Sequence, residues 1–125
     1  MEKKAHILVV DDDEEFVLRL VKRILEPEGY IVSVATNGKS ALSALDESMP
    51  NLVLLDIRMP DFNGYQVLER IREKSDVPVI MLTAVREVTS LDKSIGLGAD
   101  DYIIKPFRPW DLLSRVQAKL RRAGL

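Results

Sequence analysis

LVLLD, at residues 52–56, is the stretch that decides the fold, because four apolar residues there end in one carboxylate. Such an apolar run is typical of a strand buried on both faces, as in a parallel sheet. Residues 7–10 repeat the pattern as ILVV and lead directly into Asp11, Asp12 and Asp13. A buried charge is costly without a partner, and open α/β sheets bind ligands at the carboxyl ends of their strands. The two runs therefore predict an acidic binding site.

The composition of the 125-residue chain fits one domain with a continuous core, since 46% of the residues are hydrophobic. Charged residues make up 30% and the net charge is -2, which gives no reason to expect nonspecific nucleic-acid binding by the domain. The absence of cysteine excludes disulfides and thiolate metal sites. The first apolar run is too short for a signal peptide or a membrane span. We therefore expect a soluble, cytoplasmic protein without a membrane partner.

Strand-like and helix-like segments alternate five times along the chain. The predicted strands cover residues 6–10, 31–35, 52–55, 79–83 and 102–104. Apolar residues at spacings of three and four predict the first helix, with a buried stripe of Phe16, Val17, Leu20, Val21 and Ile24.

Residues that favour helix ends mark the limits of the predicted helices. Gly29 ends the first helical region, and Asn37 caps the second. Asn63 precedes the third, a short fourth helix is predicted over residues 89–95, and Pro109 suits the first turn of the last. Five β/α units with short connections predict a doubly wound parallel sheet with helices on both faces. This is the flavodoxin-like (βα)5 fold, with strand order 2-1-3-4-5.

In that strand order the first and third strands are neighbours, so Asp11, Asp12 and Asp56 gather at one edge of the sheet. Three carboxylates repel one another, and a cation is needed to neutralise them. Oxygen ligands without His or Cys select Mg²⁺ or Mn²⁺. Mg²⁺ keeps several waters, which leaves room for a phosphate oxygen. Asp56 is therefore a candidate nucleophile that forms an acyl phosphate.

Two further groups reach the same rim of the sheet. Thr83 ends the fourth predicted strand and Lys105 follows the fifth, where they offer a hydroxyl and a positive charge to phosphoryl oxygens. Each residue alone has an ordinary structural explanation, and Asp13 is best explained as a helix cap. Together, five matching groups at the ends of strands are hard to attribute to chance.

Four motifs resemble those of bacterial response-regulator receiver domains, in the same order and over essentially the whole chain. They are VVDDD at 9–13, LDIRMP at 55–60, TA at 83–84 and GADDYIIKPF at 98–107. The resemblance implies that Asp56 accepts a phosphoryl group from a sensor histidine kinase. We assign residues 1–122 to the receiver domain and residues 123–125 to the start of a linker or tail.

The resemblance also implies roles for the other site residues. Asp12 would bind Mg²⁺ directly, Asp11 mainly through water, and Arg58 through its backbone carbonyl. The implied contacts to the phosphoryl oxygens come from Thr83, the Ala84 amide and Lys105. The Lys105–Pro106 bond is expected to be cis and to aim Lys105 into the pocket. The domain would be a phosphoacceptor rather than an enzyme, with self-catalysed phosphotransfer and slow self-dephosphorylation, because Arg58 and Val85 offer no help to an attacking water.

Phosphorylation in this family shifts a two-state equilibrium. The resemblance assigns the switch to Thr83 and Tyr102. Another set resembles the dimer ion pairs of receivers attached to winged-helix DNA-binding domains: Asp100, Asp101, Asp111, Arg115 and Arg122. The expected cross-subunit pairs of a two-fold dimer are Asp101 with Arg115 and Asp100 with Arg122. DNA would be bound only through a C-terminal domain outside this chain. Leu91 departs from the pattern, since a basic residue is expected there to face Asp111.

Other functions stay open from the sequence alone. The nearest alternative is a stand-alone receiver in a phosphorelay or a protein-docking role. A haloacid-dehalogenase-type phosphatase would need a second Asp at the position of Arg58, and a flavodoxin-like electron carrier would suffer repulsion between its flavin phosphate and the acidic first loop. Trp110 is expected to pack over the edge of the last helix, and the alternative is an exposed contact with a partner. The single histidine, His6, lies away from the rim.

Overall fold

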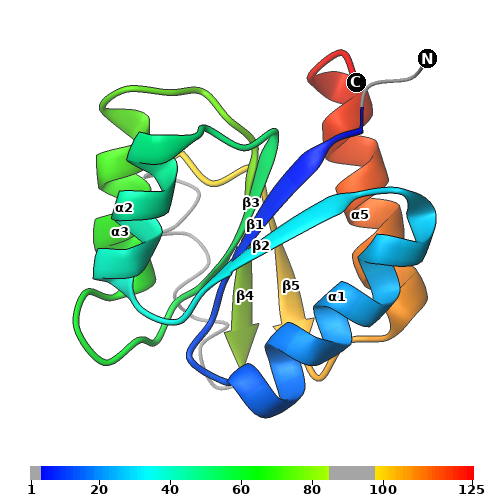
Figure 1. The fold of residues 1–125 in the computed structure, drawn as a ribbon, viewed down its shortest axis with the longest axis horizontal. Helices are drawn as coiled ribbons and strands as arrows, with labels where there is room; N and C mark the ends of the chain where they lie inside the picture. Colours follow the sequence, from blue (N-terminus) through cyan, green and yellow to red (C-terminus); the bar gives the residue numbers. More distant parts are fainter. Residues whose placement is uncertain (1–3, 85–97) are drawn as a thin grey trace.

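The structure is a computed structural model that describes residues 4–84 and 98–125. One sheet of parallel strands has the order β2-β1-β3-β4-β5, which confirms the predicted fold. The strands are β1 (His6–Val10), β2 (Ile31–Ala35), β3 (Leu52–Asp56), β4 (Val79–Ala84) and β5 (Asp101–Lys105). The helices shown in Figure 1 are α1 (Arg19–Leu25), α2 (Gly38–Glu47), α3 (Gly64–Arg72) and α5 (Pro109–Arg122). A π-helical turn, η1 (Glu14–Leu18), precedes α1, and a 3₁₀ turn, η2 (Glu26–Glu28), follows it.

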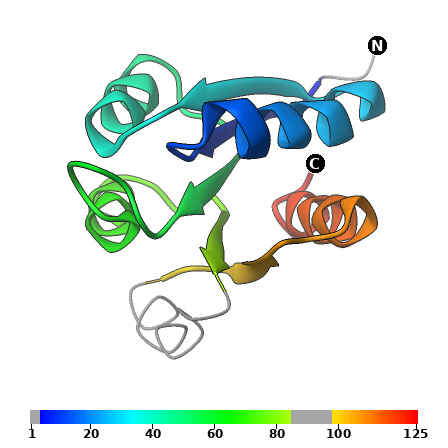
Figure 2. The ribbon, with the colours of Figure 1, turned by 90° about the horizontal axis from the view of Figure 1, so that it is seen from below.

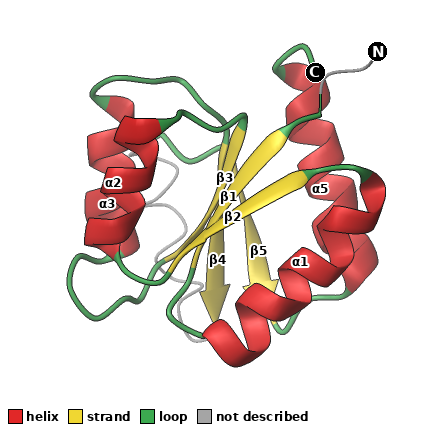
Figure 3. Ribbon diagram, viewed as in Figure 1, coloured by secondary structure: helices red, strands yellow, loops and turns green. Residues whose placement is uncertain are grey.

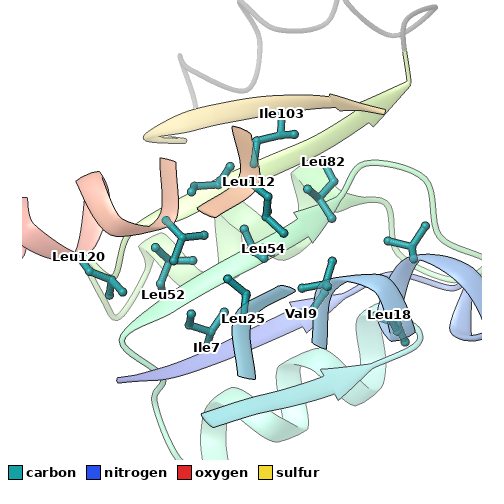
Figure 4. Packing of buried hydrophobic residues seen from close by; sticks show 14 of the residues in the cluster. Ile7, Val9, Leu18, Leu25, Leu52, Leu54, Leu82, Ile103, Leu112 and Leu120 are labelled. Atoms are coloured by element: carbon teal, nitrogen blue, oxygen red, sulfur yellow. The ribbon is translucent and has the colours of Figure 1, made fainter. Parts of the chain in front are cut away.

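Two helical layers cover the sheet. Helices α1 and α5 lie on one face, and α2 and α3 lie on the other (Figure 2). The core divides in the same way: Ile7 and Val9 of β1 join the cluster under α1 and α5, which Figure 4 draws, whereas Leu8 and Val10 join the cluster under α2 and α3. This division follows from the alternation of side chains along a strand. Each fully buried aliphatic side chain contributes about 1.5–3 kcal/mol, which is why both faces of residues 52–55 are apolar.

The predicted caps are present at the helix ends. The side chains of Asn37 and Asn63 each accept a hydrogen bond from the backbone N–H three residues on, and both form capping boxes with α2 and α3. Gly29 ends the first helical region with a φ of 94°, a left-handed conformation that favours glycine. Pro109 is the first residue of α5. Figure 3 shows these helices beside the strands, with the connecting loops at the two ends of the sheet.

Three strands run further than the apolar pattern predicted. Strand β3 includes Asp56, β4 includes Ala84, and β5 extends from Asp101 to Lys105. In the parallel register Asp56 lies opposite Leu82, and Ala84 lies opposite Lys105. Backbone pairing depends little on side-chain polarity, so the strands continue through the polar residues of the rim. The candidate site residues are consequently held by the sheet itself.

Two aromatic side chains are not packed as predicted. Phe16 is 65% exposed, and the buried residues of the first helical region are Val17, Leu18, Val21 and Leu25. These four residues keep the helical spacing of three and four, and Phe16 lies beside their stripe, within the π turn in which the Leu18 N–H donates to the Asp13 carbonyl. Trp110 is 76% exposed, so the expectation that it packs over the edge of α5 is also wrong.

Some predictions fall on residues outside the described ranges. These are the helix predicted over residues 89–95 and the roles considered for Val85 and Leu91. Within residues 4–84 and 98–125, no helix has both the length and the hydrophobicity that a membrane crossing requires.

Candidate functional site

The carboxylates of Asp11, Asp12 and Asp56 meet at the carboxyl edge of the sheet. Strand β1 lies beside β3 with Val10 opposite Leu55, so the acidic residues that follow are neighbours. One oxygen from each of the three carboxylates lies within 4.8 Å of the others. Asp11 is fully buried and Asp56 is only 7% exposed, whereas Asp12 is exposed. The strand order thus produces the acidic cluster that the sequence predicted.

Lys105 supplies a positive charge to this cluster from the end of β5. Its Nζ lies 2.7 Å from Asp11 Oδ2 and 3.4 Å from Asp56 Oδ1. The other oxygen of Asp11 accepts a hydrogen bond of 2.9 Å from the Asp13 backbone N–H. Both oxygens of Asp11 therefore have a protein partner. The Lys105–Pro106 peptide bond is cis, as predicted.

The pKa values of Asp56 and Lys105 reflect this crowding. Burial and then the charge of Asp11 raise the pKa of Asp56 from its ordinary value of 3.8 to about 6, against the opposing effects of Lys105 and of the Arg58 backbone N–H. Burial alone would lower the pKa of Lys105, but its hydrogen bond to Asp11 and the charge of Asp56 raise it. One ammonium thus lies between two buried carboxylates, and the pKa of Asp56 stays raised in spite of it.

The donor set fits a small divalent cation. Carboxylate oxygens without thiolate or imidazole ligands are the donors that Mg²⁺ prefers, and a divalent ion would offset the excess negative charge. Beside the cluster lies a cavity of about 400 Å³, bordered by Asp12, Asp56 and Lys105 and walled on one side by residues 57–60. The site therefore has room for a group bound next to Asp56.

Thr83 and Ala84 lie at the end of β4, between Asp56 and Lys105 in the sheet. Ala84 borders the cavity. Thr83 is fully buried, and its hydroxyl donates to the Ala84 carbonyl at 3.2 Å. The predicted contact between Thr83 and a phosphoryl oxygen would require its hydroxyl to leave this bond.

A larger cavity lies away from the acidic cluster. Its volume is about 540 Å³, and Lys4, Tyr30, Gln117 and Leu125 are among its lining residues. Among the described residues, Glu28 is the one carboxylate side chain that borders it. The smaller cavity is the candidate functional site, because the buried charges and Asp56, whose pKa is raised, border it.

Comparison with known proteins decides the family. Residues 7–117 match the family model of the response regulator receiver domain. The chain belongs to this family. It is similar to a receiver domain protein described as CheY-like from Methanospirillum hungatei, with a TM-score of 0.89 and 36% identity over 96% of each chain. The receiver assignment removes the phosphatase and flavodoxin alternatives.

Longer proteins also contain a similar domain. The chain is 44% identical over 124 residues to the probable transcriptional regulator ycf27 of Guillardia theta, covering 99% of this chain and 48% of that protein. It is 43% identical over 119 residues to the DNA-binding response regulator MtrA of Mycolicibacterium paratuberculosis, covering 95% and 52%. The receiver thus spans about half the length of the curated relatives it matches.

Four of the predicted interface residues, Asp100, Asp101, Asp111 and Arg115, are already paired within one chain. Arg115 donates to Asp101 at 2.8 Å and to Asp111 at 3.1 Å. The carboxylate of Asp100 accepts a hydrogen bond of 2.9 Å from Arg72, not from Arg122. Cross-subunit pairing therefore stays a prediction, and it would require these side chains to exchange partners.

Tyr102 and His6 lie on different parts of the receiver. The Tyr102 ring is half-buried, and the Arg115 guanidinium carbon lies 6.0 Å from its centroid, so a movement of the ring would reach the ion pairs of α5. His6 is at the start of β1, where its Nε2 lies 2.7 Å from the Ser33 hydroxyl. His6 is thus remote from the acidic cluster, as expected.

Sequence reasoning missed two residues that organise the loops. Arg72 donates to the carbonyls of Ser75, Val77 and Gly98 and ties the end of α3 to the start of β5. Asp61, in the loop after β3, accepts hydrogen bonds from the first two residues of α2. The partners that lie in other loops are 22 to 28 residues away, and no local pattern indicates contacts over that distance.

Proposed function

We propose that this receiver is a phosphorylation-activated switch in which Asp56 accepts a phosphoryl group from a sensor histidine kinase. The observation that carries the proposal is the placement of Asp56, nearly buried at the end of β3 between an acidic neighbour and Lys105, beside a cavity of about 400 Å³. The Asp56 side chain borders the cavity, where an incoming group could reach it.

Asp11, Asp12, Asp56 and the Arg58 carbonyl would hold Mg²⁺ or Mn²⁺. When bound, the ion would offset negative charge on the carboxylates and on the transferred group. The protein's own contribution is to fix the nucleophile. Asp11 is held by Lys105 and by the Asp13 N–H, so the carboxylate of Asp12, exposed beside the cavity, is the more accessible ligand.

In the transfer, an Asp56 carboxylate oxygen attacks phosphorus while the bond from phosphorus to the kinase imidazole breaks. The imidazole nitrogen keeps the electron pair, so the phosphoryl group is exchanged with no other reactant. Lys105, 3.4 Å from Asp56, would place its positive charge against the incoming phosphoryl oxygens. The Thr83 hydroxyl and the Ala84 N–H would donate to the same oxygens.

The output would follow from movements of Thr83 and Tyr102. If Thr83 leaves the Ala84 carbonyl for the phosphoryl group, it makes room for Tyr102 to turn inward. Arg115 would then lose its contact with the Tyr102 ring and become available to Asp101 of a second copy. Phosphorylation would thus control a homodimer through β5 and α5.

The names of the longer relatives support a transcriptional output. They are a probable transcriptional regulator and a DNA-binding response regulator, and this receiver spans about half of each. We infer that residues 1–122 form the receiver, that residues 123–125 begin a linker, and that a C-terminal domain outside this chain binds DNA. The family assignment also supports a cytoplasmic location.

The test of the phosphoacceptor is to incubate the protein with acetyl phosphate and Mg²⁺ and to measure its intact mass. We expect one added phosphoryl group in the wild type and none in Asp56→Ala. Asp76→Ala, which removes an exposed carboxylate from the loop before β4, is the matched control and should be phosphorylated normally. Phosphorylation of Asp56→Ala to the wild-type extent would refute the assignment.

The test of the dimer is charge reversal. Arg115→Glu should abolish the phosphorylation-dependent increase in mass measured by sedimentation velocity, while leaving phosphorylation of Asp56 intact. Arg70→Glu, on the exposed side of α3, is the control. A phosphorylated Arg115→Glu dimer as tight as that of the wild type would count against this interface.

A further inference from the structure

The wall of the proposed magnesium site is the loop from Ile57 to Asn63. The base of this loop is closed by a hydrogen bond of 2.7 Å from the Gly64 N–H to the Ile57 carbonyl. The fit is close, since a Cβ on Gly64 would lie 2.3 Å from the Asp56 carbonyl oxygen. Arg58, the second residue of this loop, donates its backbone N–H to the Asp56 carboxylate. The contacts that hold the loop therefore matter for the site.

Asp61 joins the loop to α2. Its Oδ1 accepts the Gly38 N–H at 2.8 Å, and its Oδ2 accepts the Lys39 N–H at 3.0 Å. Residual desolvation would raise the pKa of the Asp61 carboxyl, but the hydrogen bonds from Lys39 and Gly38 outweigh it and lower the pKa. The ionised side chain thus accepts from both of the first two residues of the helix.

Phe62 reinforces the same junction. A Cβ on Gly38 would lie 2.7 Å from the Phe62 Cβ, so the ring packs directly over the start of α2. Gly38 is itself buried. The loop after β3 therefore contacts the N-terminus of α2 in two ways: Asp61 accepts hydrogen bonds from it, and Phe62 packs against it.

The start of α2 is in turn connected to the other acidic loop. The Asp11 N–H donates to the Ala35 carbonyl at 3.0 Å, at the end of β2 and close before α2. A continuous path of hydrogen bonds and short backbone segments thus runs from Asp11, through α2 and Asp61, to the Arg58 and Asp56 loop. Asp11 and Asp12, which follow β1, are thus linked to Asp56 and Arg58 by this path as well as by the sheet.

We propose that Asp61 is a positioning residue for the metal site. By binding the first two N–H groups of α2, it fixes the loop that presents the Arg58 carbonyl relative to Asp11 and Asp12. Asp61 itself touches neither the ion nor the phosphoryl group. The proposal rests on the proposed function, because it concerns the same site.

An ordinary helix-capping role predicts a different result, and the chain contains the control that separates the two. Asn37 also caps α2, and its Oδ1 accepts the Ser40 N–H at 2.8 Å. Asn37 lies outside the ligand loop, so Asn37→Ala weakens the helix end without releasing residues 57–63. If Asn37→Ala and Asp61→Ala both weaken Mg²⁺ binding, the cause is the loss of a helix cap. If only Asp61→Ala weakens Mg²⁺ binding, the cause is the loss of positioning.

The experiment is a Mg²⁺ titration of the unphosphorylated protein, followed by the amide chemical shifts of residues 56–58. Asp61→Ala should weaken Mg²⁺ binding about threefold to tenfold. Loss of a residue that hydrogen-bonds directly to a metal ligand typically weakens binding about tenfold to a hundredfold, and Asp61 acts one step further from the ion. Asp61→Asn keeps one acceptor oxygen and should recover part of the affinity. Asn37→Ala should bind Mg²⁺ as the wild type does.

Phosphorylation by acetyl phosphate gives a second readout. Asp61→Ala should raise the Mg²⁺ concentration for half-maximal rate and leave the rate at saturating Mg²⁺ near the wild-type value, since the reacting groups are unchanged. Equal Mg²⁺ affinity of Asp61→Ala and the wild type, or an equal loss in Asn37→Ala, would overturn the positioning role alone. A wild type that bound no Mg²⁺ would overturn the proposed function and this inference together.

Discussion

Two charged regions of the receiver use the same ion-pair chemistry in different surroundings. At the acidic cluster, Lys105 lies 2.7 Å from Asp11, and on the surface of β5 and α5, Arg115 lies 2.8 Å from Asp101. The Asp11 carboxylate is 1% exposed and that of Asp101 is 19% exposed, and the Lys105 and Arg115 side chains are 23% and 38% exposed. The distances are nearly equal, so burial is what distinguishes the two pairs.

Burial changes what each pair can do. Water and salt screen the exposed pair, which can exchange partners at little cost. The buried charges have no such alternative, because a buried charge that loses its partner is exposed to neither water nor salt. The two regions therefore differ in what they can do. The carboxylates around Asp56 repel one another, and a change of charge there would relieve this repulsion. The exposed ion pairs of Arg115 can change partners at a small cost in free energy.

The largest expected effect is that of Lys105→Met, which leaves Asp11 buried without its ammonium partner. In metal-free buffer at pH 7 the free energy of unfolding should fall by about 3–5 kcal/mol. Urea denaturation measures the loss. Lys74→Met, which removes an exposed lysine paired with Asp46, should cost no more than about 1 kcal/mol. Similar losses in the two variants would erase the distinction between the regions.

The next largest effect is a gain in the free energy of unfolding, on replacing Asp56. The pKa of Asp56 is raised from 3.8 to about 6, so the folded protein binds a proton between these values that the unfolded chain has released. Stability from this group is therefore lost as the pH rises from about 4 to 6, and the ionised Asp56 costs about 2–3 kcal/mol at pH 7. Asp56→Asn should recover this free energy.

The measurement is urea denaturation of the wild type and Asp56→Asn in EDTA at a series of pH values. The two curves should separate progressively between about pH 4 and pH 6 and run parallel above it. Asp76→Asn, an exposed substitution, should follow the wild type at every pH. A constant difference between Asp56→Asn and the wild type would mean that the carboxylate of Asp56 is not strained by its neighbours.

The smallest effect belongs to the exposed pairs. Arg115→Ala removes the contacts to Asp101 and Asp111 and should lower the free energy of unfolding by about 1 kcal/mol or less. The difference should shrink further in about 1 M NaCl, where the screening length is near 3 Å. A loss as large as that of Lys105→Met, or one insensitive to salt, would show that the surface pairs are structural after all.

Local sequence patterns predicted the parts of the fold that depend on neighbours in the chain. The apolar runs located every strand, and Asn37 and Asn63 located two helix starts, because a cap acts on residues only three positions away. The burial of Phe16 is predicted wrongly, because apolar spacing alone does not show where the buried stripe of a helix begins. The exposure of Trp110 likewise depends on which elements pack against α5, and the local sequence does not show this.

The sequence by itself determined that carboxylates stand at the ends of two buried strands, and the alternation of strands and helices then implied that these ends meet. Only the tertiary structure decided how far each charge is buried, that Asp61 binds α2, and that Arg115 and Asp100 are already paired within one chain. The reason is physical. Side-chain type and spacing act over a few residues, whereas burial, and the hydrogen bonds between distant loops, exist only when the sheet has brought those loops together.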